Sequence, residues 1–332
     1  MVGEGEATIS DQWRRLLDQF PEIEPYQSGM LPVSDGQHVY WEACGHPAGK
    51  PALVLHGGPG SGCMPSYRRY FNPDVYRIVL FDQRGAGRST PRVNATTDLS
   101  TNTTVNLIVD IEQLREQLDI DQWLIFGVSW GVTLGLAYAQ RHPRRVSAMI
   151  LSSVTMTRAE EIHWLYHEAG RYFPEEWMRF RAGVPEAERD GDLVSAYYRL
   201  LHEQPDLAIR ERAAKDWCVW EDALQSLEED WTPNPRYADS AFRITFARIV
   251  THYFHHRAWL ASNQLLREAH RLSGIPGVLI HGRLDLGSPP DTAWQLAQAW
   301  PDAELRFVRT GHGGGKSLRA CIIGATTRFS RR

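Results

Sequence analysis

Three residues whose side chains can cooperate in acyl chemistry each follow an apolar run typical of a buried strand. They are Ser129 after residues 123–126, Asp285 after residues 277–281 and His312 after residues 305–308. Serine attacks an acyl carbon poorly unless a base accepts its proton, and that base needs a carboxylate to orient it. The three residue types therefore predict nucleophilic catalysis, with Ser129 attacking, His312 moving the proton and Asp285 orienting His312.

The segment around Ser129 has the pattern of a sharp turn between a strand and a helix. Gly127 and Gly131 flank the serine, and an apolar helical pattern over residues 132–139 follows and stops before Pro143. Glycine allows a turn so tight that any side chain would collide with the neighbouring strand or helix. Such a nucleophile elbow projects the hydroxyl above a parallel sheet, although a serine in an ordinary strand-to-helix loop has the same local pattern.

Considered alone, Asp285 and His312 could each have an ordinary structural role instead of a catalytic one. A loop aspartate commonly caps a helix or forms a turn, and a loop histidine is commonly a surface residue. The chain order serine, acid, histidine is the order of folds that use this elbow. The three positions together therefore favour a catalytic triad.

A glycine-rich loop, residues 56–60 with the sequence HGGPG, follows the apolar run 51–55. Acyl transfer needs two fixed N–H donors for the tetrahedral oxyanion, one after the nucleophile and one from an early loop. We expect these donors to be the backbone N–H groups of Trp130 and Gly58. The alternatives are a plain glycine turn or a phosphate-binding loop, but the lysine and hydroxyl residue of a Walker motif are missing.

The elements that must position these residues form a β/α series. Apolar runs at residues 51–55 and 76–81 are typical of strands buried on both faces of a parallel sheet, and a further apolar run occupies residues 123–126. Residues 146–151, 277–281 and 305–308 also have strand patterns, and residues 38–43 alternate as a further strand. Helical patterns occupy residues 104–118, 132–139, 294–300 and 318–329. The carboxyl ends of parallel strands meet at one edge of a sheet, where we expect the ligand site.

The strand pattern disappears from about Thr157 to Leu272, where helical spacing and many aromatic residues replace it. A β/α series interrupted in this way predicts an α/β fold with one mostly parallel sheet, flanking helices and an inserted helical cap. We expect the first part of the core over residues 1–154, the cap over 155–272 and the second part of the core over 273–332. An amphipathic segment at residues 11–17 predicts an N-terminal helix.

Composition limits the classes of partner. The chain has 332 residues, with 36 Lys and Arg against 40 Asp and Glu, and a formal net charge of −4. This balance argues against nucleic acid or an anionic membrane as partner and favours a small solute. No apolar run has the length of a membrane span or a signal peptide. Four widely spaced cysteines indicate neither a disulfide framework nor a zinc site, so we expect a reducing, cytoplasmic location.

Six segments spread over nearly the whole chain carry a family resemblance. They are PEIEPY at 21–26, SGML at 28–31, the loop at 56–60, DQRGAGRS at 82–89, the elbow at 127–131 and HGRLD at 281–285. In these segments the chain resembles the prolyl aminopeptidase (proline iminopeptidase) family of the α/β-hydrolase fold. The resemblance implies cleavage of an N-terminal residue, typically proline, from a short peptide, without a metal or cofactor. It leaves the oligomeric state open.

An aminopeptidase must hold the cationic amine of its substrate, because burying an unpaired ammonium costs several kcal/mol. Residues 217–221 match the family segment whose glutamate binds the amine, so the resemblance implies Glu221 in this role. A solvated helix glutamate is the ordinary alternative. The resemblance also implies Phe254 and Tyr166 as substrate-binding residues. The expected partner is a small peptide or amide substrate with a free amine.

Three positions depart from the family pattern. Val250 stands where a second glutamate is usual, Thr155 where a phenylalanine of the proline pocket is expected, and Lys316 where an acidic residue is usual. We therefore expect Val250 and Thr155 to alter recognition of the amine and the ring. This leaves open an esterase, amidase or acyl transferase that acts on a small metabolite with the same triad.

Two further readings are weaker. A non-catalytic binding protein built on the same fold would not need the complete triad. His252, His255 and His256 suggest a metal site, but no acidic residue is placed to complete it, and a polar helix face explains them more simply.

Overall fold

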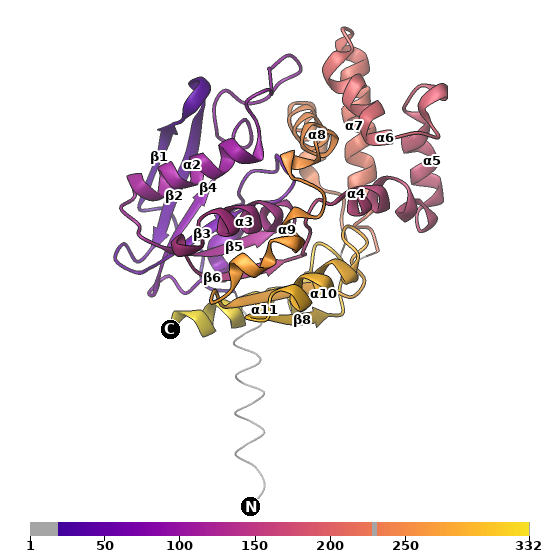
Figure 1. Ribbon diagram of the computed structural model, residues 1–332. Helices are drawn as coiled ribbons and strands as arrows, with labels where there is room; N and C mark the ends of the chain where they lie inside the picture. Colours follow the sequence, from indigo (N-terminus) through magenta and orange to yellow (C-terminus); the bar gives the residue numbers. More distant parts are fainter. Residues whose placement is uncertain (1–18, 228–230, 332) are drawn as a thin grey trace, which may run out of the picture.

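One mixed sheet organises the protein (Figure 1). The computed structural model describes residues 19–227 and 231–331, so the helix predicted at residues 11–17 lies outside the described residues. The sheet has eight strands in the order β1-β2-β4-β3-β5-β6-β7-β8. The strands are β1 (Gln27–Pro32), β2 (His38–Gly45), β3 (Lys50–Leu55), β4 (Tyr76–Phe81), β5 (Trp123–Val128), β6 (Val146–Ser152), β7 (Gly277–Gly282) and β8 (Ala303–Val308).

The sheet is parallel from β4 to β8 and antiparallel where β1 and β2 pair at the other edge. The mostly parallel sheet predicted from the apolar runs is therefore confirmed. Strand β1 was not predicted, because four of its six residues are exposed and it carries no apolar run. It pairs with β2 at a place where Gly29 leaves room for the Trp41 ring, since a Cβ there would lie 3.2 Å from the indole nitrogen.

Alternate residues of the central strands pack on opposite faces of the sheet. Leu53 and Leu55 of β3 belong to the apolar cluster on the face covered by α2 (Thr104–Gln117), α3 (Trp130–Arg141), α9 (Gln264–Arg267) and α10 (Pro290–Ala299). Ala52 and Val54 belong to the cluster on the other face, under α11 (Gly315–Ser330). Because both faces are covered by helices, the central strands read as continuous apolar runs in the sequence.

Within the described part of the chain, five α-helices between β6 and α9 form a separate group at the upper right of Figure 1, called the helical layer below. They are α4 (Ala159–Tyr166), α5 (Pro174–Ala182), α6 (Leu193–Tyr198), α7 (Leu207–Ala223) and α8 (Ser240–His255). The layer has an aromatic core of its own, in which the rings of Phe180 and Tyr197 stack with centroids 4.4 Å apart. It therefore packs as a unit beside the sheet rather than as part of the sheet's core.

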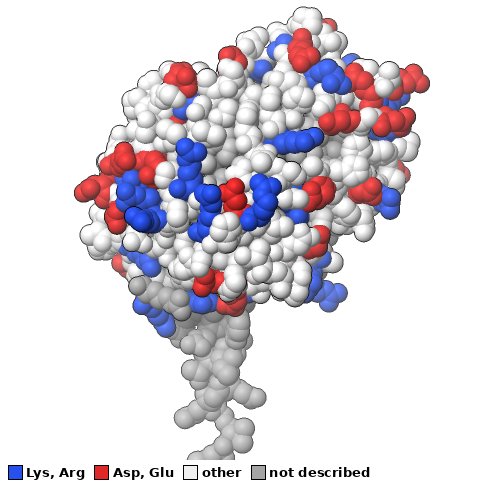
Figure 2. Space-filling model, viewed as in Figure 1, with Lys and Arg blue, Asp and Glu red and all other residues white. Residues whose placement is uncertain are grey.

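The surface carries charges of both signs. Figure 2 shows Lys and Arg intermixed with Asp and Glu over the visible face, as the small net charge predicts. Along the part of the chain that the structure describes, no helix combines the length and apolarity needed to span a bilayer. All four cysteines are free thiols.

Candidate active site

The turn between β5 and α3 holds Ser129 in a strained backbone conformation, with φ 54° and ψ −122°. A Cβ on Gly127 would lie 2.5 Å from the carbonyl oxygen of Gly131, and a Cβ on Gly131 would lie 2.1 Å from that of Leu55. Backbone atoms cannot withdraw as a flexible side chain can, so only glycine fits on either side of the serine. The strand, turn and helix predicted around Ser129 are confirmed.

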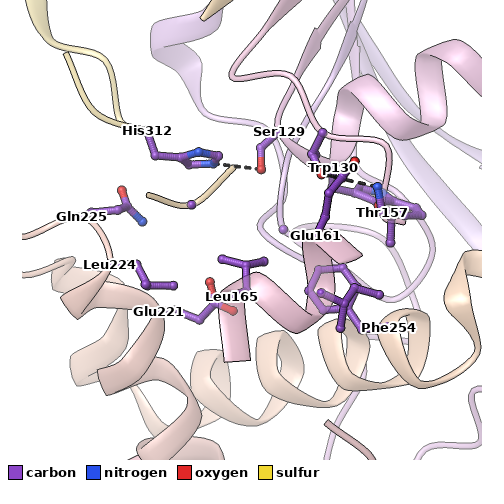
Figure 3. Close-up of a pocket in the computed structure, with 14 residues that line it drawn as sticks. Ser129, Trp130, Thr157, Glu161, Leu165, Glu221, Leu224, Gln225, Phe254 and His312 are labelled. Atoms are coloured by element: carbon purple, nitrogen blue, oxygen red, sulfur yellow. Dashed lines mark hydrogen bonds between the residues drawn. The ribbon is translucent and has the colours of Figure 1, made fainter. Parts of the chain in front are cut away.

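His312 connects Ser129 to Asp285 by hydrogen bonds. Its Nε2 lies 3.0 Å from Ser129 Oγ (Figure 3), and its Nδ1 lies 2.9 Å from each carboxylate oxygen of Asp285. When the Nδ1–H group donates a hydrogen bond to the carboxylate, Nε2 carries no proton and can accept a hydrogen bond from the serine hydroxyl. The structure thus brings together, at one edge of the sheet, three residues that follow β5, β7 and β8.

Asp285 is only 1% exposed. Burial opposes its ionisation, but His312 beside it and the Ser288 N–H, 2.8 Å from Oδ1, together hold the pKa of the carboxyl below its usual range. The loop of His312 is fixed as well, because Ser153 Oγ donates a 2.8 Å hydrogen bond to the His312 carbonyl oxygen. The imidazole packs over Gly287, where a Cβ would lie 2.8 Å from the ring.

Gln83 ties the glycine-rich loop to the elbow. Its side-chain amide donates to the His56 carbonyl oxygen at 3.0 Å, and its Oε1 accepts from the Trp130 indole N–H at 2.9 Å. The backbone N–H of Gln83 donates to Nε2 of His56, also at 3.0 Å. One buried side chain therefore sets the position of Gly58 relative to Trp130. No role for Gln83 was predicted from the sequence, although it lies within the segment 82–89.

A small cavity of about 50 Å³ separates these residues from the helical layer (Figure 3). It is lined by Gly58, Ser129, Trp130 and His312 from the sheet edge, by Ile162, Leu165, Glu221, Leu224, Gln225 and Phe254 from the helical layer, and by Thr155, Thr157, Glu161 and Gly287. Phe254 comes from α8 and Glu221 from α7. The predicted ligand position, above the carboxyl ends of the strands and beneath the inserted helices, is where this cavity lies.

Glu221 is the carboxylate on the helical side of the cavity. The hydroxyl of Tyr166 donates a 2.6 Å hydrogen bond to its Oε1. Burial raises the pKa of Glu221, and the hydrogen bond from Tyr166 opposes this rise. Tyr166 itself is fully buried behind the carboxylate and packs against Trp217, with ring centroids 4.6 Å apart. The hydrogen-bonded pair thus places the Glu221 carboxylate across the cavity from Ser129.

A second carboxylate, Glu161 of α4, also lines the cavity, and the sequence did not predict it. Its Oε2 accepts from the Thr155 hydroxyl and from the Met156 N–H, each at 2.8 Å, and its Oε1 accepts from Arg158 Nε at 2.5 Å. Because all these bonds run to residues 155–158, Glu161 holds the segment that leads from β6 into the helical layer. No local motif marks this role, which depends on the turn after β6.

Two of the predicted substrate-binding residues, Tyr166 and Val250, are not among the residues that line the cavity. Both are fully buried in the aromatic core of the helical layer. Their assignment as substrate-binding residues stays a prediction. Within the described residues no group of three or more His, Cys, Asp or Glu side chains is arranged to hold a metal ion.

Comparisons with known proteins identify the family of the chain. A family model described as the alpha/beta hydrolase fold matches residues 50–314. The chain is 49% identical over 326 residues to a probable proline iminopeptidase of Streptomyces coelicolor, with 95% of this chain and 98% of the relative covered. It is 47% identical over 291 residues to a proline iminopeptidase of Xylella fastidiosa, with 87% and 91% covered. It is 44% identical over 300 residues to one of Arabidopsis thaliana, with 90% and 78% covered.

Solved structures share the fold at low sequence identity. A proline iminopeptidase of Mycobacterium smegmatis has a TM-score of 0.59 and 19% identity, with 92% of this chain and 99% of that chain covered. An esterase from Rhodococcus sp. ECU1013 has a TM-score of 0.58 and 16% identity, with 92% and 98% covered. At these identities the likeness concerns the fold alone, and the family assignment rests on the closer relatives. By its matched fold model and by its identity to these relatives, the chain belongs to the proline iminopeptidase family of the α/β-hydrolase fold.

Proposed function

We propose that this protein is a serine aminopeptidase that releases an N-terminal residue, most readily proline, from short peptides through an acyl-enzyme. The observation that carries the proposal is the hydrogen-bonded series Ser129, His312 and Asp285 on one wall of a cavity whose facing wall holds Glu221. A nucleophile opposite an acidic group fits a substrate whose free amine lies next to its scissile carbonyl.

The geometry supports a two-step acyl transfer. His312 Nε2 accepts the Ser129 proton as Oγ attacks the acyl carbon, and Asp285 stabilises the imidazolium that forms. His312 then gives the proton to the leaving amine as the C–N bond breaks, and Ser129 is left acylated. A water molecule then gives a proton to His312 as it attacks the ester carbon, and His312 returns that proton to Ser129 Oγ as the ester C–O bond breaks and the free amino acid leaves.

We assign the oxyanion donors to the backbone N–H groups of Gly58 and Trp130. The Trp130 N–H lies in the first turn of α3, where a helix has no acceptor of its own for backbone donors. Gly58 has φ +113°, a conformation that side chains disfavour, and lines the same cavity. One such donor contributes about 3 kcal/mol to transition-state stabilisation.

In this proposal the substrate amine pairs with Glu221, and Phe254 contacts the N-terminal residue. Tyr166 positions the Glu221 carboxylate, because its hydroxyl donates a hydrogen bond to Oε1. We assign a change in specificity to Thr155 and Val250. Thr155 has a hydroxyl where the family usually has a phenylalanine ring, and Val250 is neutral where the family usually has a second carboxylate. We therefore expect this protein to prefer proline over other small N-terminal residues less strongly than an enzyme that has both the ring and the second carboxylate.

The same proposal treats residues 1–154 and 273–332 as the catalytic core and residues 155–272 as its cap. It places the enzyme in a reducing cytoplasm, a location that fits four free cysteines. The substrate is a small peptide or amide with a free amine.

A second candidate function is an esterase, amidase or acyl transferase that acts on a small metabolite. The Thr155 hydroxyl bonded to Glu161 favours it, because this makes part of the cavity wall polar. The two functions differ in whether the substrate needs a free amine.

The test is a panel of aminoacyl arylamides, proline included, assayed with wild type, Ser129→Ala and Val250→Glu. We expect wild type to hydrolyse the prolyl arylamide and Ser129→Ala to lose activity by about 10⁴-fold or more. Val250→Glu should shift the ranking of N-terminal residues. If the folded wild type hydrolyses no member of the panel while a fluorophosphonate still labels Ser129, the aminopeptidase proposal is lost and the second candidate remains.

A further inference from the structure

His281 is a buried histidine at the carboxyl end of β7, four residues before Asp285. Its ring is 0% exposed and packs edge-on against Phe307 of β8, with ring centroids 6.2 Å apart and an interplanar angle of 87°. It is not among the residues that line the catalytic cavity. Burying a polar ring is unfavourable unless its nitrogens are hydrogen-bonded, so the partners of His281 indicate what the residue does.

Both ring nitrogens of His281 have backbone partners, and these fix its tautomer. The N–H of Val154 donates to Nδ1 at 3.0 Å, so Nδ1 carries no proton. The proton is therefore on Nε2, which donates to the Ser288 carbonyl oxygen at 2.9 Å. Burial lowers the pKa of His281, although the Asp285 carboxylate opposes this shift, so the ring is neutral at neutral pH.

A third hydrogen bond closes these contacts into a cycle, called the His281 network below. The Ser288 hydroxyl donates to the Val154 carbonyl oxygen at 2.6 Å. Each of His281, Ser288 and Val154 is therefore bonded to the other two, and none is more than 1% exposed. Hydrogen bonds in such a buried cycle are strong and specify one arrangement. The network thus joins the loop after β7 to the segment after β6.

Ser288 connects the His281 network to Asp285. The Ser288 N–H donates to Asp285 Oδ1 at 2.8 Å, and His281 Nε2 lies 3.7 Å from Asp285 Oδ2. The Ser288 carbonyl oxygen is held by His281 and its hydroxyl by Val154, so its N–H has little freedom to move. His281 therefore determines where the Asp285 carboxylate accepts this hydrogen bond.

Ser153, the residue before Val154, connects the same network to His312. Its hydroxyl donates to the His312 carbonyl oxygen at 2.8 Å, and its N–H donates to the carbonyl oxygen of Ile280, the residue before His281, at 3.0 Å. Its φ is +52°, in the left-handed region that a serine rarely adopts. The loops of Asp285 and of His312 are therefore both fixed to the short segment at residues 153–154.

We infer that His281 is a positioning residue for the reaction: through Ser288 and residues 153–154 it holds Asp285 and His312 at the separation that their hydrogen bonds require. It touches neither the substrate nor the reacting atoms. Its contribution is to the rate, because a displacement of about 1 Å within such a constellation costs roughly a hundredfold. This role rests on the proposed function of Ser129, His312 and Asp285, but it does not depend on which substrate they attack.

The test uses two measurements on the full-length protein that need no substrate. One is the rate constant with which a fluorophosphonate labels Ser129, and the other is the proton NMR resonance of His312 Nδ1–H, assigned by its absence in His312→Ala. His281→Gln keeps an N–H donor for Ser288 but loses the acceptor for Val154, and Ser288→Ala loses the hydroxyl bond to Val154. We expect each variant to be labelled about tenfold more slowly, or slower still, with a shifted resonance.

Thr326→Val is the matched control. Thr326 is 0% exposed on α11, and its hydroxyl donates to the Tyr70 carbonyl oxygen at 2.7 Å. The variant therefore removes the same kind of buried bond as Ser288→Ala, from a residue that does not line the cavity. We expect it to leave the labelling rate and the resonance unchanged.

Circular dichroism shows which variants fold, and if one of His281→Gln and Ser288→Ala does not fold, the other decides. The positioning role is overturned if the folded variants are labelled as fast as Thr326→Val. It is also overturned if labelling is slower but the His312 resonance does not move, since the effect then lies outside the Asp285 and His312 pair. Failure of the proposed function looks different, because the fluorophosphonate then does not label wild type, and the resonance alone decides whether His281 positions the pair.

Discussion

The hydroxyl of Tyr166 donates a 2.6 Å hydrogen bond to Oε1 of Glu221, across the catalytic cavity from Ser129. Burial disfavours the charge of this carboxylate, and the hydrogen bond restores part of what burial removes. In the proposed function, the other carboxylate oxygen is the one that binds the substrate amine. The folded protein therefore keeps a buried carboxylate whose ionisation burial disfavours.

Glu221→Gln should increase stability while it removes activity. The pKa of Glu221 is raised in the folded protein, so the folded state penalises ionisation. This penalty is absent below the unfolded-state pKa of about 4.3 and is complete above the folded-state pKa. We therefore expect Glu221→Gln to raise the melting temperature at about pH 8 and leave it unchanged at about pH 3.

The same variant should lower kcat/KM for prolyl arylamide by roughly a hundredfold, because the buried ammonium loses its partner. A Glu221→Gln protein that is less stable at the higher pH, or fully active, would contradict this account.

Tyr166→Phe should shift the pH dependence of the reaction. It removes a donor that lowers the pKa of Glu221, so that pKa should rise further. The acid limb of kcat/KM should move to higher pH, with about tenfold loss at neutral pH from one missing hydrogen bond to a charged group. The measurement is a pH profile for a free-amine substrate. An unchanged acid limb in a folded Tyr166→Phe protein would remove Tyr166 from the site.

Gly131→Ala should disrupt the elbow, whereas Gly135→Ala on the same helix should be tolerated. A Cβ at Gly131 would lie 2.1 Å from the Leu55 carbonyl oxygen, which belongs to the central strand β3. A Cβ at Gly135 would meet only side-chain atoms, those of Ile125 at 3.2 Å, Leu55 at 3.3 Å and Met149 at 3.7 Å. Alanine also favours a helix interior over glycine by about 1 kcal/mol. In denaturant unfolding, we expect the free energy of unfolding to fall by roughly 4 kcal/mol for Gly131→Ala and to change little for Gly135→Ala. Equal stabilities of the two variants would contradict the tight turn.

Gln83→Ala tests how the oxyanion loop is positioned. The Gln83 side chain joins the His56 carbonyl oxygen to the Trp130 indole, so its loss frees the loop of Gly58 from the elbow. We expect kcat to fall by about 10- to 100-fold, since one misplaced donor loses much of its contribution. KM should change little, because Gln83 does not line the cavity. A variant with raised KM and normal kcat would indicate a role in substrate binding instead.

Much of the fold could be predicted because local patterns of apolar residues in the sequence indicate its strands and helices. The central strands are buried on both faces and therefore appear as apolar runs in the sequence. Ser129, Asp285 and His312 could be placed together because each follows a strand of the parallel part of the sheet. Strand β1 could not be predicted in this way, because it lies at an edge and buries few residues.

The parts of the site that escaped prediction depend on tertiary contacts. Gln83 acts through His56 and Trp130, which are 27 and 47 residues away in sequence. Glu161 holds the segment after β6 through backbone and side-chain bonds that no motif records. Val250 was singled out because of its neighbours in the sequence, but its side chain lies in the core of the helical layer. The roles assigned to Glu221, Thr155 and Phe254 remain predictions.

The measurement that tests the central claim most directly compares kcat/KM for prolyl arylamide and for its N-acetylated form. Acetylation keeps the scissile bond and the ring but removes the positive charge that Glu221 is proposed to bind. We predict at least a hundredfold preference for the free amine in wild type, since an ion pair removed from solvent is worth about 3 kcal/mol or more. The preference should nearly vanish in Glu221→Gln. Equal rates for the two substrates in wild type would contradict an amine-directed peptidase.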